Sequence, residues 1–499
     1  MAEQPQSERD YYTPILWSLL AVAVLFLCVL PLWNGFWLDE CAIFYVIHAG
    51  FGQIIPRCFI SLQSFAFSML EWVPLALGAT SGPAFRLPCL AAGLITVFVL
   101  DRLGREVSGP RFGLTLAALF VSLPQVAIDI PSARPYAIAM LLESAGLLCF
   151  FRWLKSGRLQ HGLAWTACGV AVGYFHYLFL VPVALEALYA VKTFVGRSRT
   201  QFLQVGICGS VGILLLLPLA SQLREMARQS RWLSSQSEPE WISLLLIGLP
   251  GFLLLTLILI VGVEWLAGSS VRWRPLACNR DVPKVGLLLL IVPAVFYFAV
   301  SRLTVTNMFL SRYLLPSLIG GVLVWAWLIE GFESPRLRQG AVLTGVIFGM
   351  LLAARTAVVP GYVLNYLGQD WSAAARTLPN AGHYLIYPGL AETARLQWLQ
   401  QPKRQEYFAA PVALFRPDIS SENSDIVPFR FGAEEKEYMQ AIVRRLAAQR
   451  TQVSFIGWGL TNAVQWQEWL SGELAQRGFS KTSDQAQAAL LVTVWTPPE

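Results

Sequence analysis

The sequence carries few charged residues. Asp, Glu, Lys and Arg make up 14% of its 499 residues, whereas a soluble globular protein has about 25%. This scarcity excludes a soluble globular protein, and an apolar content of 55% excludes an intrinsically disordered chain. Lys and Arg exceed Asp and Glu by only six and form no dense run, so nucleic acid is not an expected partner.

Patterns that bind metals or form disulfides are scarce as well. The eight cysteines include no C-x-x-C spacing and no cluster with histidine, so the sequence carries no zinc-site signal. No cofactor follows from the sequence, and a divalent metal stays an open alternative. Cys41 and Cys58 alone share a segment on the polar side of the membrane, which makes them the one candidate disulfide.

Long apolar runs are abundant, and the mean hydropathy is +0.53. A helix needs about 20 mostly apolar residues to cross a bilayer. The first such run, Ile15 to Trp33, lacks a small-residue cleavage site and is interpreted as an anchor rather than a removed signal peptide. Ten further runs bring the number of predicted spans to eleven. These ten cover 84–100, 112–130, 133–151, 162–175, 177–191, 202–220, 242–266, 285–300, 313–330 and 340–358.

Basic residues predict the orientation of these spans. Sixteen lysines and arginines fall on the side assigned to the cytoplasm and eight on the other, as the positive-inside rule requires. The stretches 112–151 and 162–191 each have basic flanks at both ends, so each is predicted to be a hairpin with its tip outside. Eleven crossings from a cytoplasmic N-terminus leave the C-terminus outside.

The composition changes at about residue 360. Residues 1–359 form the predicted transmembrane domain, and 360–499 contain no 20-residue apolar run. Short apolar runs predict strands at His383–Tyr387, Val453–Gly457 and Ala489–Trp495, and amphipathic patterns predict helices at Ala391–Leu399, Glu434–Ala448 and Ala463–Arg477. We therefore expect a mainly α protein, a polytopic helix bundle with a small external α/β domain at its C-terminus.

The first external loop, residues 34–83, is strongly apolar and suits helices that lie in the membrane interface. It opens with Asp39 and Glu40, and carboxylates at that depth are costly unless they are paired or used. The competing interpretation of Asp39 is a helix N-cap. Glu40 lies about 100° further around a helix, so it faces a different point. A functional and a structural role both remain open for it.

Other candidate residues lie at the external ends of later spans. Arginine binds phosphate through its fork of donors, although a single arginine at a helix end also reaches lipid headgroups. Interfacial tyrosine is ordinary. The candidates are Asp129, Arg134, Tyr136, His176, Tyr177, Arg312 and Tyr313.

Two further carboxylates, Glu143 and Glu186, fall inside predicted spans. An ionisable group within the membrane is a functional-site hypothesis by default. The alternative is that each pairs with a Tyr, Trp or Arg on a neighbouring helix.

Several short motifs together resemble the integral-membrane glycosyltransferases of the GT-C fold. The resemblance is closer to bacterial relatives of the dolichyl-phosphate-mannose protein mannosyltransferases and to the lipid A aminoarabinose transferases. In chain order the matching motifs are Leu38-Asp39-Glu40, Phe85-Arg86-Leu87-Pro88, Ala133-Arg134-Pro135-Tyr136, His176-Tyr177, Arg312-Tyr313-Leu314-Leu315-Pro316 and Asp370-Trp371-Ser372-Ala373-Ala374.

This resemblance implies a multi-pass protein of the bacterial inner membrane. It would move a sugar, with inversion, from a polyprenyl-phosphate donor to a cell-envelope lipid, glycan or protein on the external, periplasmic face. By the same resemblance, Asp39 and Glu40 are catalytic candidates, and Arg134, Arg312 and Arg86 are candidates for binding the donor phosphate. The substrate-binding candidates are Asp129, Tyr136, His176, Tyr177 and Tyr313.

Two positions depart from the family pattern. Ser132 stands where many relatives have Glu, and Gln63-Ser64-Phe65 corresponds to a His-Pro-Pro stretch. These departures keep open an inactive homologue that serves as a partner subunit. The many spans and the external arginines keep open a second alternative, a transporter or flippase of lipid-linked saccharide.

Overall fold

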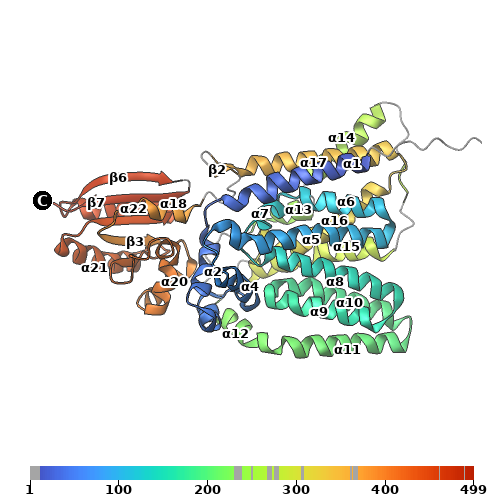
Figure 1. Ribbon diagram of the computed structural model, residues 1–499, viewed down its shortest axis with the longest axis horizontal. Coiled ribbons are helices and arrows are strands. Elements are labelled where there is room, and N and C mark those ends of the chain that lie inside the picture. The colour runs from blue at the N-terminus through green and yellow to red at the C-terminus, as the bar shows by residue number, and fades with distance from the viewer. Residues whose placement is uncertain are drawn as a thin grey trace, which may run out of the picture.

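The computed structural model is an elongated helix bundle with a sheet-containing domain at one end (Figure 1). It describes residues 12–229, 239–248, 251–266, 272–274, 280–304, 308–359, 362–363, 369–459, 461–487 and 489–498. The predicted domain boundary at residue 360 lies outside the described residues.

Seven helical segments of the described chain are long and apolar enough to cross a membrane. They are Thr13–Trp33, Gly82–Ser108 (α5), Tyr136–Ser156 (α8), Tyr177–Val195, Arg199–Gln229, Asp281–Leu303 (α15) and Ser311–Glu330. Four shorter helices, α6 (Pro110–Ser122), α9 (Leu159–Phe175), α13 (Trp241–Gly248) and α14 (Gly251–Leu266), cover other predicted runs. The last predicted run lies in the 23-residue helix α17 (Pro335–Ala357), which is not among those seven segments. The protein is a polytopic membrane bundle, and the count of eleven spans stays a prediction.

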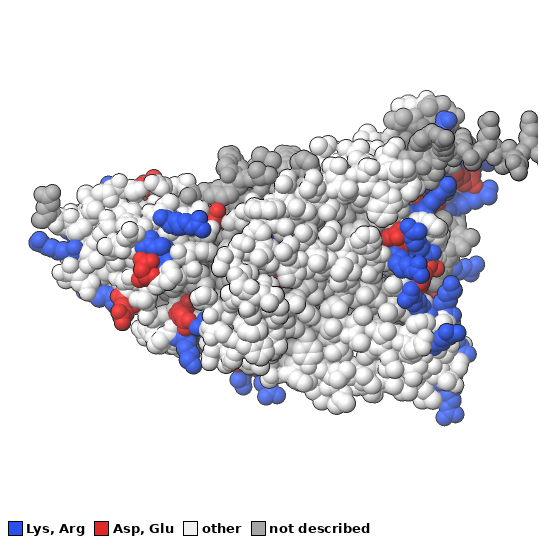
Figure 2. All heavy atoms as spheres, in the orientation of Figure 1, with Lys and Arg blue, Asp and Glu red and all other residues white. Residues whose placement is uncertain are grey.

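Lysine and arginine gather at the end of the bundle that lies away from the sheet domain (Figure 2). Some of these residues pair with acids on the same surface; Arg105 lies 2.6 Å from Asp101, and Arg152 bonds Glu106. The positive-inside rule predicts that an end rich in lysine and arginine faces the cytoplasm. The arrangement agrees with the expected orientation, which stays a prediction.

The first loop folds into three short helices between the bundle and the sheet domain: α2 (Leu38–His48), α3 (Ile54–Ser61) and α4 (Phe65–Ala76). Gly50, with φ +91°, turns the chain after α2, in a conformation that only glycine adopts readily. The apolar side chains of α2 are mostly buried, because α4 and a helix of the C-terminal domain, α20 (Pro402–Ala413), pack against α2. Cys41 and Cys58 are separate buried thiols, so the candidate disulfide is not formed.

The C-terminal domain contains a five-stranded sheet in the order β4-β3-β5-β7-β6. Its strands are β3 (His383–Tyr387), β4 (Ser424–Ile426), β5 (Val453–Trp458), β6 (Ser480–Gln487) and β7 (Leu490–Thr496). Strand β3 runs parallel to β4 and β5, and β7 runs antiparallel to β5 and β6. The helices are α18 (Trp371–Arg376), α19 (Leu396–Leu399), α20, α21 (Ala433–Gln449) and α22 (Thr461–Ala475).

Three strands of this sheet were predicted and two were missed. Strand β6 is polar along its length and largely exposed, and β4 has only three residues, so neither carries an apolar strand pattern. The helix predicted over 391–399 was wrong. A 3₁₀ turn at Ala391–Ala394 and a four-residue helix replace it, separated at Arg395, where the backbone is extended.

The C-terminal domain is held against the start of α2. The backbone N–H of Trp371 donates to the carbonyl of Phe36 at 3.1 Å, and the N–H of Leu38 donates to Oε1 of Gln369, also at 3.1 Å. The Phe36 and Phe415 rings stack with centroids 5.7 Å apart. These contacts place the domain directly over the N-terminus of α2.

Helices α5 and α6 approach closely through glycines. A Cβ atom added at Gly104 would lie 2.4 Å from the Cα of Gly113, which is backbone and cannot rotate away. We therefore expect Gly104→Ala to cost about 1–3 kcal/mol of stability by overpacking. Gly209 on α11 (Arg199–Leu216) has no atom within 4 Å of such a Cβ, so Gly209→Ala is the matched control. Thermal unfolding of both purified variants checks this; equal melting temperatures would contradict it.

Candidate functional site

Asp39 meets two arginines from distant parts of the chain. Its Oδ2 lies 3.5 Å from Nη2 of Arg134 and 3.4 Å from Nη1 of Arg312. Arg134 lies in the turn before α8, and Arg312 lies in the 3₁₀ turn Ser311–Leu314 that precedes α16 (Leu315–Glu330). Helix α2 begins at Leu38 with Trp37 as its N-cap, so the alternative interpretation of Asp39 as a cap was wrong.

The three charged side chains line a cavity of about 220 Å³. It lies at the sheet-domain end of the bundle, where the first loop and the C-terminal domain meet the helices. Of the candidates named from the sequence, the structure brings seven around this one cavity: Asp39, Arg134, Tyr136, His176, Tyr177, Arg312 and Tyr313.

Both cavity arginines keep donors free. Nη1 of Arg134 donates to the backbone oxygen of Asp39 at 3.0 Å and to Oε1 of Gln63 at 2.8 Å. The Nε atoms of Arg134 and Arg312 are buried and have no hydrogen-bond partner in the structure. Buried donors without partners are costly, so this arrangement favours binding of an anion.

Aromatic rings surround the guanidinium groups. Arg134 lies over the Tyr136 ring at 5.6 Å, and Arg312 lies over the Tyr313 ring at 5.4 Å. His176 packs between these rings, with centroids 5.3 Å from Tyr136 and 5.6 Å from Tyr313. Burial, together with the positive charges of Arg134 and Arg312, lowers the pKa of His176 to about 3. The imidazole is therefore neutral at physiological pH and adds no charge to the site.

Glu40 and Arg86 form a separate pair outside the cavity (their side chains are 0% and 3% exposed). Nε of Arg86 donates to Oε1 of Glu40 at 2.8 Å, and Nη2 donates to Oε2 at 2.5 Å. The remaining N–H groups of Arg86 donate to the backbone carbonyls of residues 32, 34 and 35. The structure does not bring these two candidates to the cavity, and Glu40 and the backbone carbonyls together use all the N–H donors of Arg86.

Glu40 also positions the arginine turn. Its Oε1 accepts a hydrogen bond of 2.8 Å from the backbone N–H of Ala133, next to Arg134.

Asp129, at the end of α7 (Pro124–Asp129), is buried and does not line the cavity. The positive charges of Arg312 and Arg134 act on its carboxyl group. The hydroxyl of Ser132 donates to the carbonyl of Ile128 at 2.9 Å, within the same turn.

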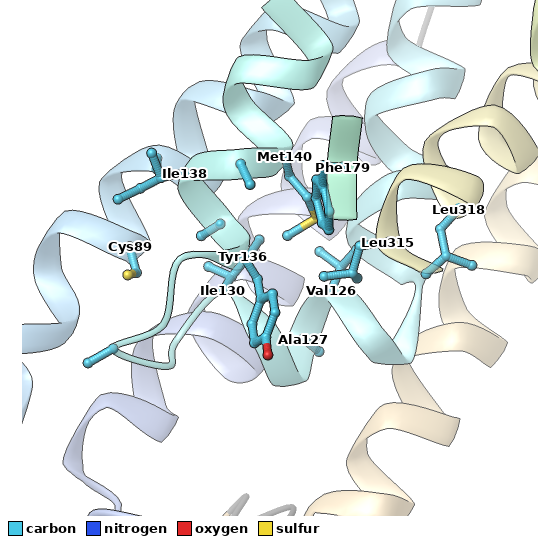
Figure 3. Close-up of a cluster of buried hydrophobic side chains, with 14 of the residues drawn as sticks. Cys89, Val126, Ala127, Ile130, Tyr136, Ile138, Met140, Phe179, Leu315 and Leu318 are labelled. Atoms are coloured by element: carbon cyan, nitrogen blue, oxygen red, sulfur yellow. The ribbon is translucent and has the colours of Figure 1, made fainter. Parts of the chain in front are cut away.

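Figure 3 shows the apolar packing beneath this turn. Tyr136 extends from the start of α8, and Ile130, Val126 and Leu315 lie near it in the same buried cluster. Phe179 and Met140 close the layer from the bundle side, and each is no more than 1% exposed. The charged floor of the cavity therefore rests on a packed apolar layer.

Sequence reasoning missed several cavity residues. Gln63, Gln222, Glu392 and Tyr407 line the same space, and the last two come from the C-terminal domain. Burial raises the pKa of Glu392, and the nearby negative charge of Asp39 adds to this effect. The sequence could have pointed to Gln63, because this residue lies where the family pattern has a His-Pro-Pro stretch. Glu392 and Tyr407 had none, because contacts over 350 residues apart in sequence bring them to Asp39.

In the part of the chain that the structure describes, no group of three or more His, Cys, Asp or Glu side chains is arranged to hold a metal ion.

No family model matches this sequence, and no curated protein matches it. The fold is similar to that of ArnT from Cupriavidus metallidurans bound to undecaprenyl phosphate, with a TM-score of 0.55 and 13% identity over 97% of this chain and 98% of that one. ArnT of the same organism in the apo state gives a TM-score of 0.52 and 11% identity over the same shares. An oligosaccharyltransferase from Archaeoglobus fulgidus gives 0.46 and 10% identity over 91% of this chain and 70% of that one.

The two ArnT likenesses confirm the fold predicted from the sequence. This chain has the GT-C fold, a polytopic helix bundle followed by a small C-terminal α/β domain.

The Glu40–Arg86 pair gives a stability prediction. Glu40→Ala leaves the Arg86 guanidinium buried without its counter-charge, which costs about 3–5 kcal/mol. Glu106→Ala is the matched control: it removes the partner of Arg152 from a half-exposed pair, for which about 0–1 kcal/mol is expected. Thermal unfolding in detergent measures both; a Glu40→Ala variant as stable as Glu106→Ala would contradict the assigned role.

Proposed function

We propose that this protein is a membrane glycosyltransferase that moves a sugar from a polyprenyl-phosphate donor to an acceptor hydroxyl. The observation that carries the proposal is the single cavity in which the Asp39 carboxylate faces the guanidinium groups of Arg134 and Arg312. The GT-C fold supports it, and one of the similar ArnT structures contains undecaprenyl phosphate.

The arginines suit the phosphate of such a donor. A guanidinium binds phosphate oxygens through parallel N–H groups and is always charged. The unpartnered Nε atoms of Arg134 and Arg312 supply donors without breaking existing hydrogen bonds. In this proposal the two groups hold the donor and stabilise the charge that develops on the leaving phosphate.

Asp39 suits the role of general base. The acceptor oxygen attacks the anomeric carbon, the bond from that carbon to the phosphate oxygen breaks with its electron pair going to the phosphate, and Asp39 takes the acceptor's proton. Asp39 is ion-paired to both arginines. A bound phosphate competes for those guanidiniums and leaves the carboxylate free to accept a proton.

The C-terminal domain contributes Glu392 and Tyr407 to the lining of the cavity. Both residues carry side-chain oxygen atoms, which have the hydrogen-bonding capacity that sugar hydroxyls require. In this proposal, therefore, the domain takes part in holding the saccharide rather than only covering the bundle.

Two alternatives fit these observations less well. A transporter is expected to bind its substrate near the middle of the membrane, whereas this cavity lies at the sheet-domain end of the bundle. An inactive homologue has no need to keep Asp39, Arg134 and Arg312 around one space.

Asp39→Asn tests the proposed base. We expect transfer to fall by about 10²–10⁴-fold, because the amide cannot take the proton, while undecaprenyl phosphate still binds. Membranes containing the variant are incubated with labelled polyprenyl-phosphate sugars, and the product is counted. Asp418→Asn, on the surface of the C-terminal domain, is the control and keeps full activity. Undiminished transfer by Asp39→Asn would remove Asp39 from the mechanism, and net movement of an intact lipid-linked sugar would favour a transporter.

Arg134→Gln and Arg312→Gln test the phosphate site. Each loses a charge-assisted hydrogen bond of about 1.5–3 kcal/mol, so we expect affinity for undecaprenyl phosphate to fall by about 10–100-fold. Stabilisation of the purified protein by added undecaprenyl phosphate measures this affinity. Arg228→Gln, on the exposed face of α12 (Ala220–Gln229), is the matched control. Equal affinities for all three variants would show that the lipid phosphate binds elsewhere.

A further inference from the structure

The turn between α3 and α4 carries Gln63 to the cavity. Its backbone is strained, because Leu62 has φ +55°, a left-handed conformation that bulky residues rarely adopt. The turn is fixed from two sides: Oγ of Ser64 donates to the carbonyl of Tyr174 at 2.7 Å, and Nε2 of Gln222 donates to the carbonyl of Gln63, also at 2.7 Å. Such strain persists only where the surrounding structure holds it, and it is concentrated at binding and catalytic sites.

The side chain of Gln63 holds one corner of the Arg134 guanidinium. Nη1 of Arg134 donates to Oε1 of Gln63 at 2.8 Å and to the backbone carbonyl of Asp39 at 3.0 Å. Nε2 of Gln63 donates to the carbonyl of Ser61 at 3.3 Å, which keeps the amide oxygen turned toward Arg134. Both hydrogen atoms of Nη1 therefore have an acceptor.

The opposite edge of the guanidinium faces no such acceptors. Nε and Nη2 lie side by side on that edge, and two parallel N–H groups of this kind bind two phosphate oxygens. Nε of Arg134 has no hydrogen-bond partner in the structure, and Nη2 lies 3.5 Å from Oδ2 of Asp39, beyond the usual hydrogen-bond limit of about 3.2 Å. The two acceptors of Nη1 are neutral oxygens, so they orient the guanidinium without cancelling its charge.

We propose that Gln63 is a positioning residue that turns the Nε–Nη2 edge of Arg134 toward the donor phosphate and leaves the guanidinium its full charge. A glutamate at this position would form an ion pair with Nη1 and compete with the phosphate for the same positive charge. The inference rests on the proposed function for the identity of the ligand, whereas the contacts of Gln63 do not depend on it. Gln63 acts through Arg134 and takes part in no chemical step.

Gln63→Glu tests the need for a neutral residue. The variant keeps the shape of the side chain and its acceptor oxygen but adds a negative charge. We expect its affinity for undecaprenyl phosphate to fall about tenfold, while its melting temperature without lipid is unchanged or higher. A purely structural role predicts no loss of affinity, because a carboxylate bonds Nη1 more strongly than an amide does. Gln449→Glu, at the exposed end of α21, adds the same charge and keeps the affinity of the unmodified protein.

Gln63→Met tests the orientation separately. Methionine is neutral and of similar length but has no oxygen, so Nη1 loses one of its two acceptors. We expect the affinity to fall about threefold, because a less ordered guanidinium must be fixed on binding. This variant also keeps the proposal testable if Gln63→Glu does not fold.

Stabilisation of the purified full-length protein by added undecaprenyl phosphate measures these affinities, with Arg134→Gln as the reference. Undiminished affinity in Gln63→Glu or in Gln63→Met overturns the proposal, and so does a loss in Gln63→Glu that comes with a lower melting temperature without lipid. If Arg134→Gln weakens binding and neither Gln63 variant does, this inference alone fails. If the unmodified protein binds the lipid but transfers no sugar, the proposed function fails, and the affinities still decide the role of Gln63.

Discussion

The buried pair of Glu40 and Arg86 is the interaction on which the rest of the site depends. One guanidinium holds the carbonyls that precede α2, and one carboxylate holds both that guanidinium and the backbone next to Arg134. Three segments, the end of the first span, the start of α2 and the turn before α8, thus share one charge pair. Breaking either partner would leave a charge stranded in an apolar interior, which is far costlier than losing a surface pair.

Neighbouring acids take different tasks here because of helix geometry. Asp39 and Glu40 are adjacent, and one residue on a helix is a turn of about 100°. Glu40 therefore points into the packed interior and meets Arg86, while Asp39 points into the cavity and meets Arg134 and Arg312. A single acidic dipeptide thereby joins the structural support of the site to its chemistry.

The C-terminal domain belongs to the site as much as the bundle does. Backbone hydrogen bonds at Phe36 and Leu38 tie it to the residues just before and at the start of α2. Helix α20 packs on α2 and brings Tyr407 with it, and the preceding 3₁₀ turn brings Glu392. The small cavity is thus lined by side chains of both parts.

The sequence by itself determined the class of fold, because apolar runs of membrane-spanning length and the loss of those runs near residue 360 are local properties. It also pointed to Asp39, Arg134, His176 and Arg312, because each stands at the end of an apolar run within a recognisable motif. Only the tertiary structure decided which residues meet. Arg86 and Glu40 were candidates for the chemistry, yet they neutralise each other outside the cavity, while Glu392 and Tyr407 carry no local signal at all. Such pairings depend on contacts between segments tens to hundreds of residues apart, which neither hydropathy nor helical periodicity records.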